Sequence, residues 1–166
     1  MRIALPALFL PFLMLANLIN VKGQDWRHLV PLKSTRADVE RLLGPTKEPY
    51  FAVYHLKEGF LDIEYSSGPC RPERKGGWNV PKDVVVTLHF TPERTMRIAD
   101  LKLDPKKFRK IVDDHVIGSM YFVNDEDGIT YAVQSRKVVF VEYHPTKRDE
   151  HLYCGDHVDK QRPVNK

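Results

Sequence analysis

The amino-acid sequence predicts an α+β domain: an antiparallel β-sheet of about six strands with one or two short helices packed on one face. Three observations favour this class. Several short runs alternate apolar and polar side chains, which is typical of strands with one solvent-exposed face. The turns between most of these runs are too short for the crossover connections of a parallel sheet. One amphipathic helix with both ends marked precedes the strands.

The chain opens with the pattern of a secretory signal peptide, residues 1–23. Arg2 gives a basic start, residues 3–19 carry no charge, and the small residues Val21 and Gly23 precede a predicted cleavage site. An uncleaved membrane anchor is the alternative. The apolar run is shorter than the roughly 20 residues of a spanning helix and contains two prolines. We therefore expect a secreted or periplasmic protein with no membrane span after cleavage.

The rest of the chain predicts a single domain over residues 24–155 and a flexible tail over residues 156–166. An irregular lead-in containing Trp26 comes first, followed by a helix over residues 35–43. Ser34 or Thr35 suits the N-cap, and Thr35 with Asp38 forms a variant of the capping box. Gly44 suits the left-handed position after the last turn, and the proline that follows prevents continuation.

Six further runs have the composition of strands, and a second helix interrupts them. The predicted strands span residues 50–56, 60–65, 83–90, 115–123, 129–134 and 138–144. Between the third and fourth strands, Asp104 followed by Pro105 resembles a helix start, with Phe108, Ile111 and Val112 as its apolar stripe. The secondary structure of residues 91–103 is ambiguous from the sequence.

The first helix also carries a family resemblance. Residues 35–45 read Thr-Arg-Ala-Asp-Val-Glu-Arg-Leu-Leu-Gly-Pro, which resembles the opening helix of the SmpA/OmlA (BamE-like) small envelope proteins. The resemblance implies a small secreted bacterial α+β domain with helices on an antiparallel sheet, an architecture similar to that of the β-lactamase-inhibitory proteins. Lys33-Ser34 stands where that family has Gly-Met, and the lipid-bearing cysteine is missing. Outer-membrane anchoring is therefore not part of the expectation.

The two cysteines predict one disulfide bond. In an oxidising compartment a lone pair of cysteines is normally bonded, so Cys70 should join Cys154. Free catalytic thiols are the alternative, although the chain has no Cys-x-x-Cys motif.

The charge of the chain gives little support to a nucleic-acid partner. Removing residues 1–23 takes away Arg2 and Lys22 and no acid, so the net charge falls from +4 to +2. Nucleic-acid binding normally needs a clustered basic face. The lysine-rich stretch 106–110 and the tail are better explained as solvated surface, and we expect no nucleic-acid partner.

The long loop over residues 66–82 is the predicted binding site. Loops of this length are uncommon unless they are functional or disordered, and tryptophan with arginine is typical of interaction hot spots. The predicted binding residues are Arg71, Arg74, Lys75, Trp78 and Asn79. In the alternative interpretation Trp78 folds back onto the core and Cys70 fixes the loop.

Three weaker patterns concern metals and acids. His151 and His157 have metal-like spacing around Cys154, with His144 nearby, but a disulfide would remove the thiolate. The acidic stretch 125–128 fails the spacing of a calcium loop and predicts a hairpin turn. Asp62 and Glu64 share one face of a strand, where two solvated acids are the ordinary case.

These observations predict a non-catalytic secreted or periplasmic module that binds a protein or a cell-envelope component, without a cofactor. Its contact surfaces would be the loop over residues 66–82, here named the Trp78 loop, and one face of the sheet. The alternative is a secreted hydrolase or metal-dependent enzyme that uses the C-terminal histidines. The sequence contains no Gly-x-Ser-x-Gly elbow and no phosphate-binding glycine motif, which are the signatures of two large enzyme classes.

Overall fold

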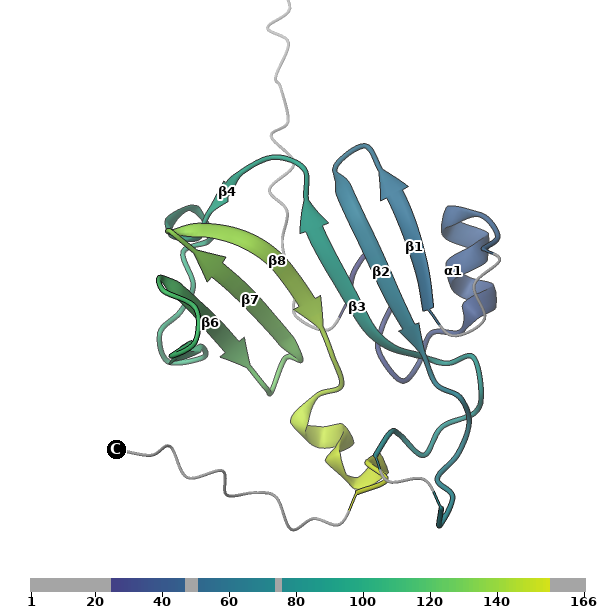
Figure 1. Ribbon diagram of the computed structural model, residues 1–166. Helices are drawn as coiled ribbons and strands as arrows, with labels where there is room; N and C mark the ends of the chain where they lie inside the picture. Colours follow the sequence, from purple (N-terminus) through teal and green to yellow (C-terminus); the bar gives the residue numbers. More distant parts are fainter. Residues whose placement is uncertain (1–24, 47–50, 74–75, 156–166) are drawn as a thin grey trace, which may run out of the picture.

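The computed structural model describes residues 25–46, 51–73 and 76–155. The predicted signal peptide and the predicted tail lie outside these residues. Within them the chain forms one antiparallel sheet of eight strands, with an α-helix at one side (Figure 1). The strands are β1 Phe51–Leu56, β2 Gly59–Tyr65, β3 Val85–Pro92, β4 Met96–Arg97, β5 Arg109–Val112, β6 Ser119–Asn124, β7 Ile129–Gln134 and β8 Lys137–Tyr143.

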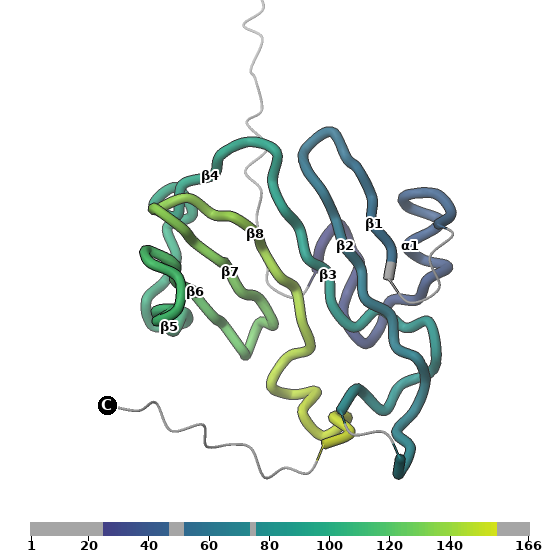
Figure 2. Tube along the Cα trace, viewed as in Figure 1, coloured from purple at the N-terminus to yellow at the C-terminus, as the bar shows by residue number. Residues whose placement is uncertain are grey.

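The strand order is β1-β2-β3-β8-β7-β6-β5, and β4 pairs with β8 off this path. β8, the last strand in the sequence, therefore lies at the centre of the sheet. It joins β1–β3 on one side to β5–β7 on the other. The β2–β3 and β7–β8 ladders each contain one register shift. Such bulges bend a sheet and increase its twist, and the sheet is visibly twisted (Figure 2).

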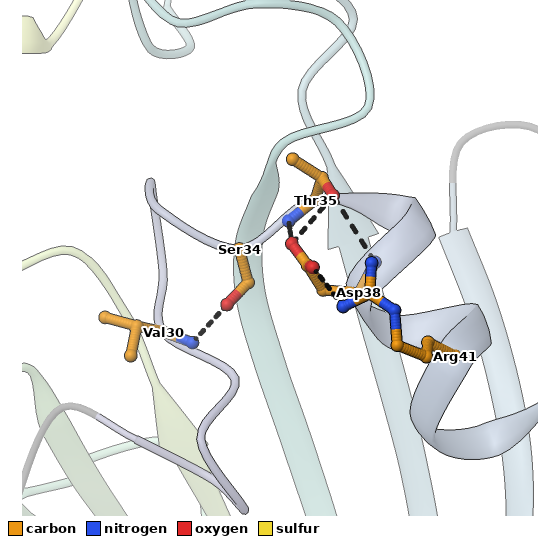
Figure 3. Close-up of polar contacts among 5 residues, drawn as sticks. All are labelled: Val30, Ser34, Thr35, Asp38 and Arg41. Carbon is orange, nitrogen blue, oxygen red and sulfur yellow. Dashed lines mark hydrogen bonds and ion pairs between the residues drawn. The ribbon is translucent and has the colours of Figure 1, made fainter.

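The helix α1 (Arg36–Leu43) has the predicted N-cap. Thr35 Oγ1 accepts the N–H of Asp38 at 3.3 Å, and Asp38 Oδ2 accepts the N–H of Thr35 at 2.8 Å (Figure 3). Ser34 is not the cap, because its Oγ accepts the N–H of Val30. Gly44 ends the helix with φ 90°, a region that favours glycine.

One face of the sheet carries the hydrophobic core. Leu61 and Ile63 on β2 and Leu88 on β3 are fully buried. The N-terminal segment, α1 and the segment around Phe108 cover this face, because Trp26 contacts Phe90 and Phe108 contacts Tyr131. The buried members of the core are Trp26, Leu29, Val39, Ala52, Tyr54, Leu61, Ile63, Tyr65, Val85, Leu88, Ile129, Tyr131, Val133, Val138, Val141 and Tyr143.

The structure corrects two parts of the sequence prediction. The antiparallel sheet is present, but it has eight strands rather than about six, and the described chain is mainly β. Apart from α1, the helical elements of the described residues are two 3₁₀ helices, η1 (Ile98–Leu101) and η2 (Lys147–Leu152). The α+β class with short helices is therefore matched only roughly.

The helix predicted from Asp104 is wrong. The N–H groups of Lys107 and Phe108 both donate to the carbonyl of Asp104, which makes a single turn. The chain then extends as β5, where Ile111 and Val112 pair with β6. Both residues are β-branched, and their pairing with a neighbouring strand outweighs the local helical spacing.

Candidate functional site

The loop after β2 is joined to the end of the domain by a disulfide bond. The predicted pair Cys70 and Cys154 is confirmed, with Cα atoms 5.4 Å apart and 84 residues of separation along the chain. The loop runs from the end of β2 to the start of β3, and residues 74–75 within it lie outside the described residues. The disulfide places this loop directly against the C-terminal segment (Figure 1).

A short backbone ladder reinforces the disulfide. The N–H of Asn79 donates to the carbonyl of Leu152 at 2.7 Å, and the N–H of Cys154 donates to that of Gly77 at 2.9 Å. Trp78 and Tyr153 are paired between these two bonds. Their rings meet edge to face with centroids 5.3 Å apart, which is a favourable aromatic geometry.

Trp78 is half-buried and does not belong to the hydrophobic core, so it neither projects freely nor folds back onto the core. Its partner Tyr153 remains 46% exposed. We call these two side chains the aromatic pair. The pair presents aromatic surface to solvent on a backbone that is held by hydrogen bonds and by a disulfide.

The segment after β8 positions Tyr153. η2 begins at a second capping box, in which Thr146 and Asp149 bond each other's backbone. The N–H of Lys147 donates to the carbonyl of Asp125 at 2.8 Å, so η2 is held to the turn between β6 and β7. The C-terminal segment therefore connects this turn to the Trp78 loop.

Trp78 lines two cavities. The first has a volume of about 240 Å³ and lies between the outer face of β2 and β3 and the loop. The polar residues Glu64, Ser66, Ser67 and Thr87 line it together with the disulfide. Ser66 Oγ already accepts the N–H of Gly68 and donates within the loop, so this wall is internally bonded.

The second cavity has a volume of about 310 Å³ and lies between Trp78, η2 and the end of β6. Charged side chains of both signs surround it. Arg109 pairs with Asp125 at 3.2 Å and Lys147 with Glu126 at 3.4 Å. The remaining charged lining residues are Lys107 and Glu150.

The predicted binding residues divide into three groups. Trp78 and Asn79 lie together beside the disulfide, and Asn79 Oδ1 accepts the N–H of Cys70 at 3.4 Å. Arg71 is exposed next to Cys70. Arg74 and Lys75 lie outside the described residues. Sequence reasoning missed Tyr153, although its position beside Cys154 was the signal that could have found it.

The C-terminal histidines do not form the predicted cluster within the described residues. Cys154 is oxidised and supplies no thiolate. His144 Nδ1 lies 2.9 Å from the carbonyl oxygen of Pro145 and Nε2 lies 3.2 Å from the Thr130 hydroxyl, so both ring nitrogens have hydrogen-bond partners within the fold. His157 lies outside the described residues, and the described part of the chain has no group of three or more metal-ligating side chains.

The uncovered face of the sheet carries a row of polar side chains across three strands. His89 on β3 lies opposite Asp62 on β2 and Glu142 on β8. His89 Nδ1 is 3.9 Å from Glu142 Oε2, and the imidazole stacks on Phe140 with centroids 4.0 Å apart. Glu64 lies on the same face as Asp62 and is exposed, so the two acids occupy the wet face that the alternation predicts.

No protein-family model, curated protein or solved structure matches this chain. Among the helices of the described residues, none has the length and apolar character required to cross a lipid bilayer.

Proposed function

We propose that this chain is an exported, non-catalytic binding module whose partner is another protein. The aromatic pair Trp78–Tyr153 is the centre of the proposed contact surface. The observation that carries the proposal is the position of this pair, partly exposed between two cavities on a disulfide-held backbone. Preorganised aromatic side chains lose little conformational freedom when a partner binds, which favours affinity.

The surroundings of the aromatic pair favour a protein partner. Interaction hot spots are aromatic centres within a polar rim, and tryptophan and tyrosine are enriched in them. Charges of both signs surround the second cavity, with Arg109 and Lys147 beside Asp125 and Glu126. Such a mixed rim fits a protein surface better than a polyanion, which would need a basic face.

The predicted export supports the same proposal. A disulfide such as Cys70–Cys154 is stable outside the reducing cytosol. We therefore propose a secreted or periplasmic location, reached through a signal peptide over residues 1–23.

Photo-crosslinking tests the partner directly. The full chain is expressed in its native host with the photo-crosslinker benzoylphenylalanine in place of Tyr153. Irradiation should give a discrete adduct with one other protein. Leu42 on α1 is the matched control site, because it is also 46% exposed and lies away from the aromatic pair. No adduct at position 153, or equal adducts at both positions, would contradict the proposal.

Affinity measurements then test the named residues. Trp78→Ala should weaken binding of the identified partner by about 30-fold or more, as truncation of an aromatic hot spot does. Leu42→Ala should leave the affinity unchanged. Sedimentation with purified peptidoglycan is the second arm. Binding to this polymer that Trp78→Ala abolishes would assign an envelope glycan instead and overturn the protein partner.

A further inference from the structure

The strand β5 forms an open edge of the sheet (Figure 2). In the described residues it pairs only with β6, and all four of its residues are exposed. Nine large hydrophobic side chains of the described residues are exposed, and four of them lie in or just after β5. These four are Ile111, Val112, Val116 and Ile117. Apolar surface is therefore concentrated at this edge.

The backbone of β5 has hydrogen-bonding groups that point away from the sheet. The N–H of Asp113 donates to the carbonyl of Ser119 at 3.1 Å, and Ile111 lies opposite Tyr121 in the same register. In an antiparallel ladder alternate residues point to the same neighbour. Residues 109, 111 and 113 therefore point towards β6, and Lys110 and Val112 direct their N–H and C=O groups outwards. Such an edge is a template for another strand.

We propose that β5 pairs with β5 of a second copy of this chain, antiparallel and centred on Ile111. The two sheets then form one continuous sheet across a two-fold axis. In this register Lys110 and the partner's Val112 exchange backbone hydrogen bonds. Ile111 lies opposite the partner's Ile111, and Arg109 lies opposite the partner's Asp113.

The side chains of β5 are complementary to themselves in this register. Arg109, Ile111 and Asp113 share one side of the strand, with opposite charges at the two ends and an apolar residue at the centre. A two-fold axis repeats each contact, so two Arg109–Asp113 pairs flank the central isoleucines. Opposite charges directly across a ladder stabilise it.

The neighbouring registers are unfavourable, which fixes the proposed one. Other registers also pair the outward N–H and C=O groups. In the two nearest of them the centre moves by one residue, to Lys110 or to Val112. Centring on Lys110 places it opposite the partner's Lys110, so two like charges meet. Centring on Val112 places Ile111 opposite the partner's Asp113, an apolar group against a carboxylate. The register centred on Ile111 avoids both conflicts.

The expected dimer is reversible. Two paired strands of this length bury less surface than the roughly 1,200–2,000 Å² of a stable specific interface. We therefore expect a dissociation constant on the order of 10 μM, which is typical of weak association. Sedimentation equilibrium of the mature, disulfide-bonded protein should show a monomer at low concentration and a dimer at high concentration.

Cysteine crosslinking tests the centre of the register. Ile111→Cys places two cysteines directly opposite each other, so most of the chain should become a reducible dimer on mild oxidation. Val53→Cys is the matched control, because Val53 is exposed to 43% against 37% for Ile111 and lies on the other edge strand, β1. Val112→Cys separates the two cysteines by about two residues of strand, beyond disulfide reach. Both controls should remain monomeric in non-reducing gels.

A charge swap tests the Arg109–Asp113 pairs. Arg109→Asp and Asp113→Arg should each weaken self-association by about tenfold, and the double variant should restore it. Within the chain Arg109 contacts Asp125, and Asp113 accepts the N–H of His115 at 2.9 Å. The double variant restores neither contact, so rescue reports on the pair between copies. A monomer at every concentration, stronger crosslinking at position 112 than at 111, or no rescue would each overturn the proposal.

Discussion

The indole ring of Trp78 and the phenol ring of Tyr153 meet edge to face, with centroids 5.3 Å apart. This contact joins the loop after β2 to the end of the folded chain. The Cys70–Cys154 bond lies beside it, and the backbone ladder between residues 77–79 and 152–154 runs through it. The geometry of the aromatic pair therefore depends on the disulfide more than on the hydrophobic core.

Replacement of both cysteines by alanine should destabilise the protein strongly. The bond closes a loop of 84 residues, and the chain-entropy model gives about 4–5 kcal/mol for a loop of this size. We expect a loss of about 3–5 kcal/mol in the free energy of unfolding, measured by urea titration of the double variant. A loss below about 1 kcal/mol would contradict this expectation.

Loss of the disulfide should also change the surroundings of Trp78. The tryptophans of the described residues respond differently, because Trp26 is only 7% exposed in the core and Trp78 is held by the loop. In the double alanine variant below its unfolding transition, Trp78 emission should shift to longer wavelength. Trp78→Phe should remove this shift and so serves as the control. An unchanged spectrum would mean that the ladder alone holds the pair.

Loss of the N-cap of α1 should cost a smaller amount. Thr35→Ala removes the oxygen that accepts the N–H of Asp38, and lost caps typically cost about 1 kcal/mol. Thr35→Ser keeps the hydroxyl and should retain most of the stability. Thermal unfolding of the two variants checks the expectation, and equal melting temperatures for both would contradict it.

The same capping box predicts a weak acid dependence. The backbone and hydroxyl of Thr35, and then Arg41, hold the pKa of Asp38 below its usual value of 3.8. The contribution of this carboxylate to stability is therefore complete above pH 3.8 and is lost as the pH falls through the lower pKa of the folded state. Asp38→Asn should flatten this part of a stability–pH curve, and an unchanged slope there would contradict the prediction.

The contrast between α1 and β5 explains which elements the sequence could predict. α1 is specified by contacts within a few residues, namely the Thr35–Asp38 cap and the Gly44 terminus, so its bounds follow from local patterns. β5 has a plausible helical stripe, but its state is decided by pairing with β6, which local spacing does not encode. The two-residue strand β4 lies in a stretch with no clear signal and exists only through its pairing with β8.

Two parts of the candidate site, the disulfide and Trp78, could be predicted from the sequence. A lone pair of cysteines in a predicted exported protein has one intramolecular pairing, so Cys70–Cys154 followed from the sequence. The loop length and its tryptophan indicated Trp78. The contribution of Tyr153 and the two cavities depends on how η2 packs against the turn after β6, which is a tertiary contact without a sequence motif.

Gly128 should be intolerant of a side chain. Its φ is 58°, and a Cβ atom there would lie 2.2 Å from the carbonyl oxygen of His144. The backbones of Gly128 and His144 lie close together, because the N–H of His144 donates to the carbonyl of Gly128. This hydrogen bond holds the start of the segment that carries Tyr153. Gly128→Ala should therefore lower the free energy of unfolding by about 2–4 kcal/mol, combining backbone strain with a steric shift.

Gly118→Ala provides the control for this position. Gly118 also has a positive φ, 75°, but a Cβ atom there would meet nothing within 4 Å. Its replacement should cost about 1 kcal/mol, which is the backbone strain alone. Equal losses for the two variants in urea titrations would show that the contact with His144 does not limit position 128.

The buried tyrosines should make the fold sensitive to alkali. Burial raises the pKa of Tyr131 from 10.0 to about 12, and burial also raises the pKa values of Tyr143 and Tyr65. The unfolded chain releases these protons near pH 10 and the folded chain releases them later. Stability is therefore complete below pH 10 and is lost as the pH rises towards 12, because unfolding releases protons in that window. For Tyr131 alone the loss over these two pH units is about 2–3 kcal/mol.

Tyrosinate absorbance and unfolding measured on the same samples check this expectation. The ionisation of Tyr131 should coincide with loss of the folded signal. Tyr131→Phe removes one late-titrating phenol while keeping the ring that packs against Phe108. Its free energy of unfolding should fall less steeply than that of the native chain between pH 10 and pH 12. An equally steep fall in the variant would mean that Tyr131 ionises in the folded state as readily as in the unfolded chain.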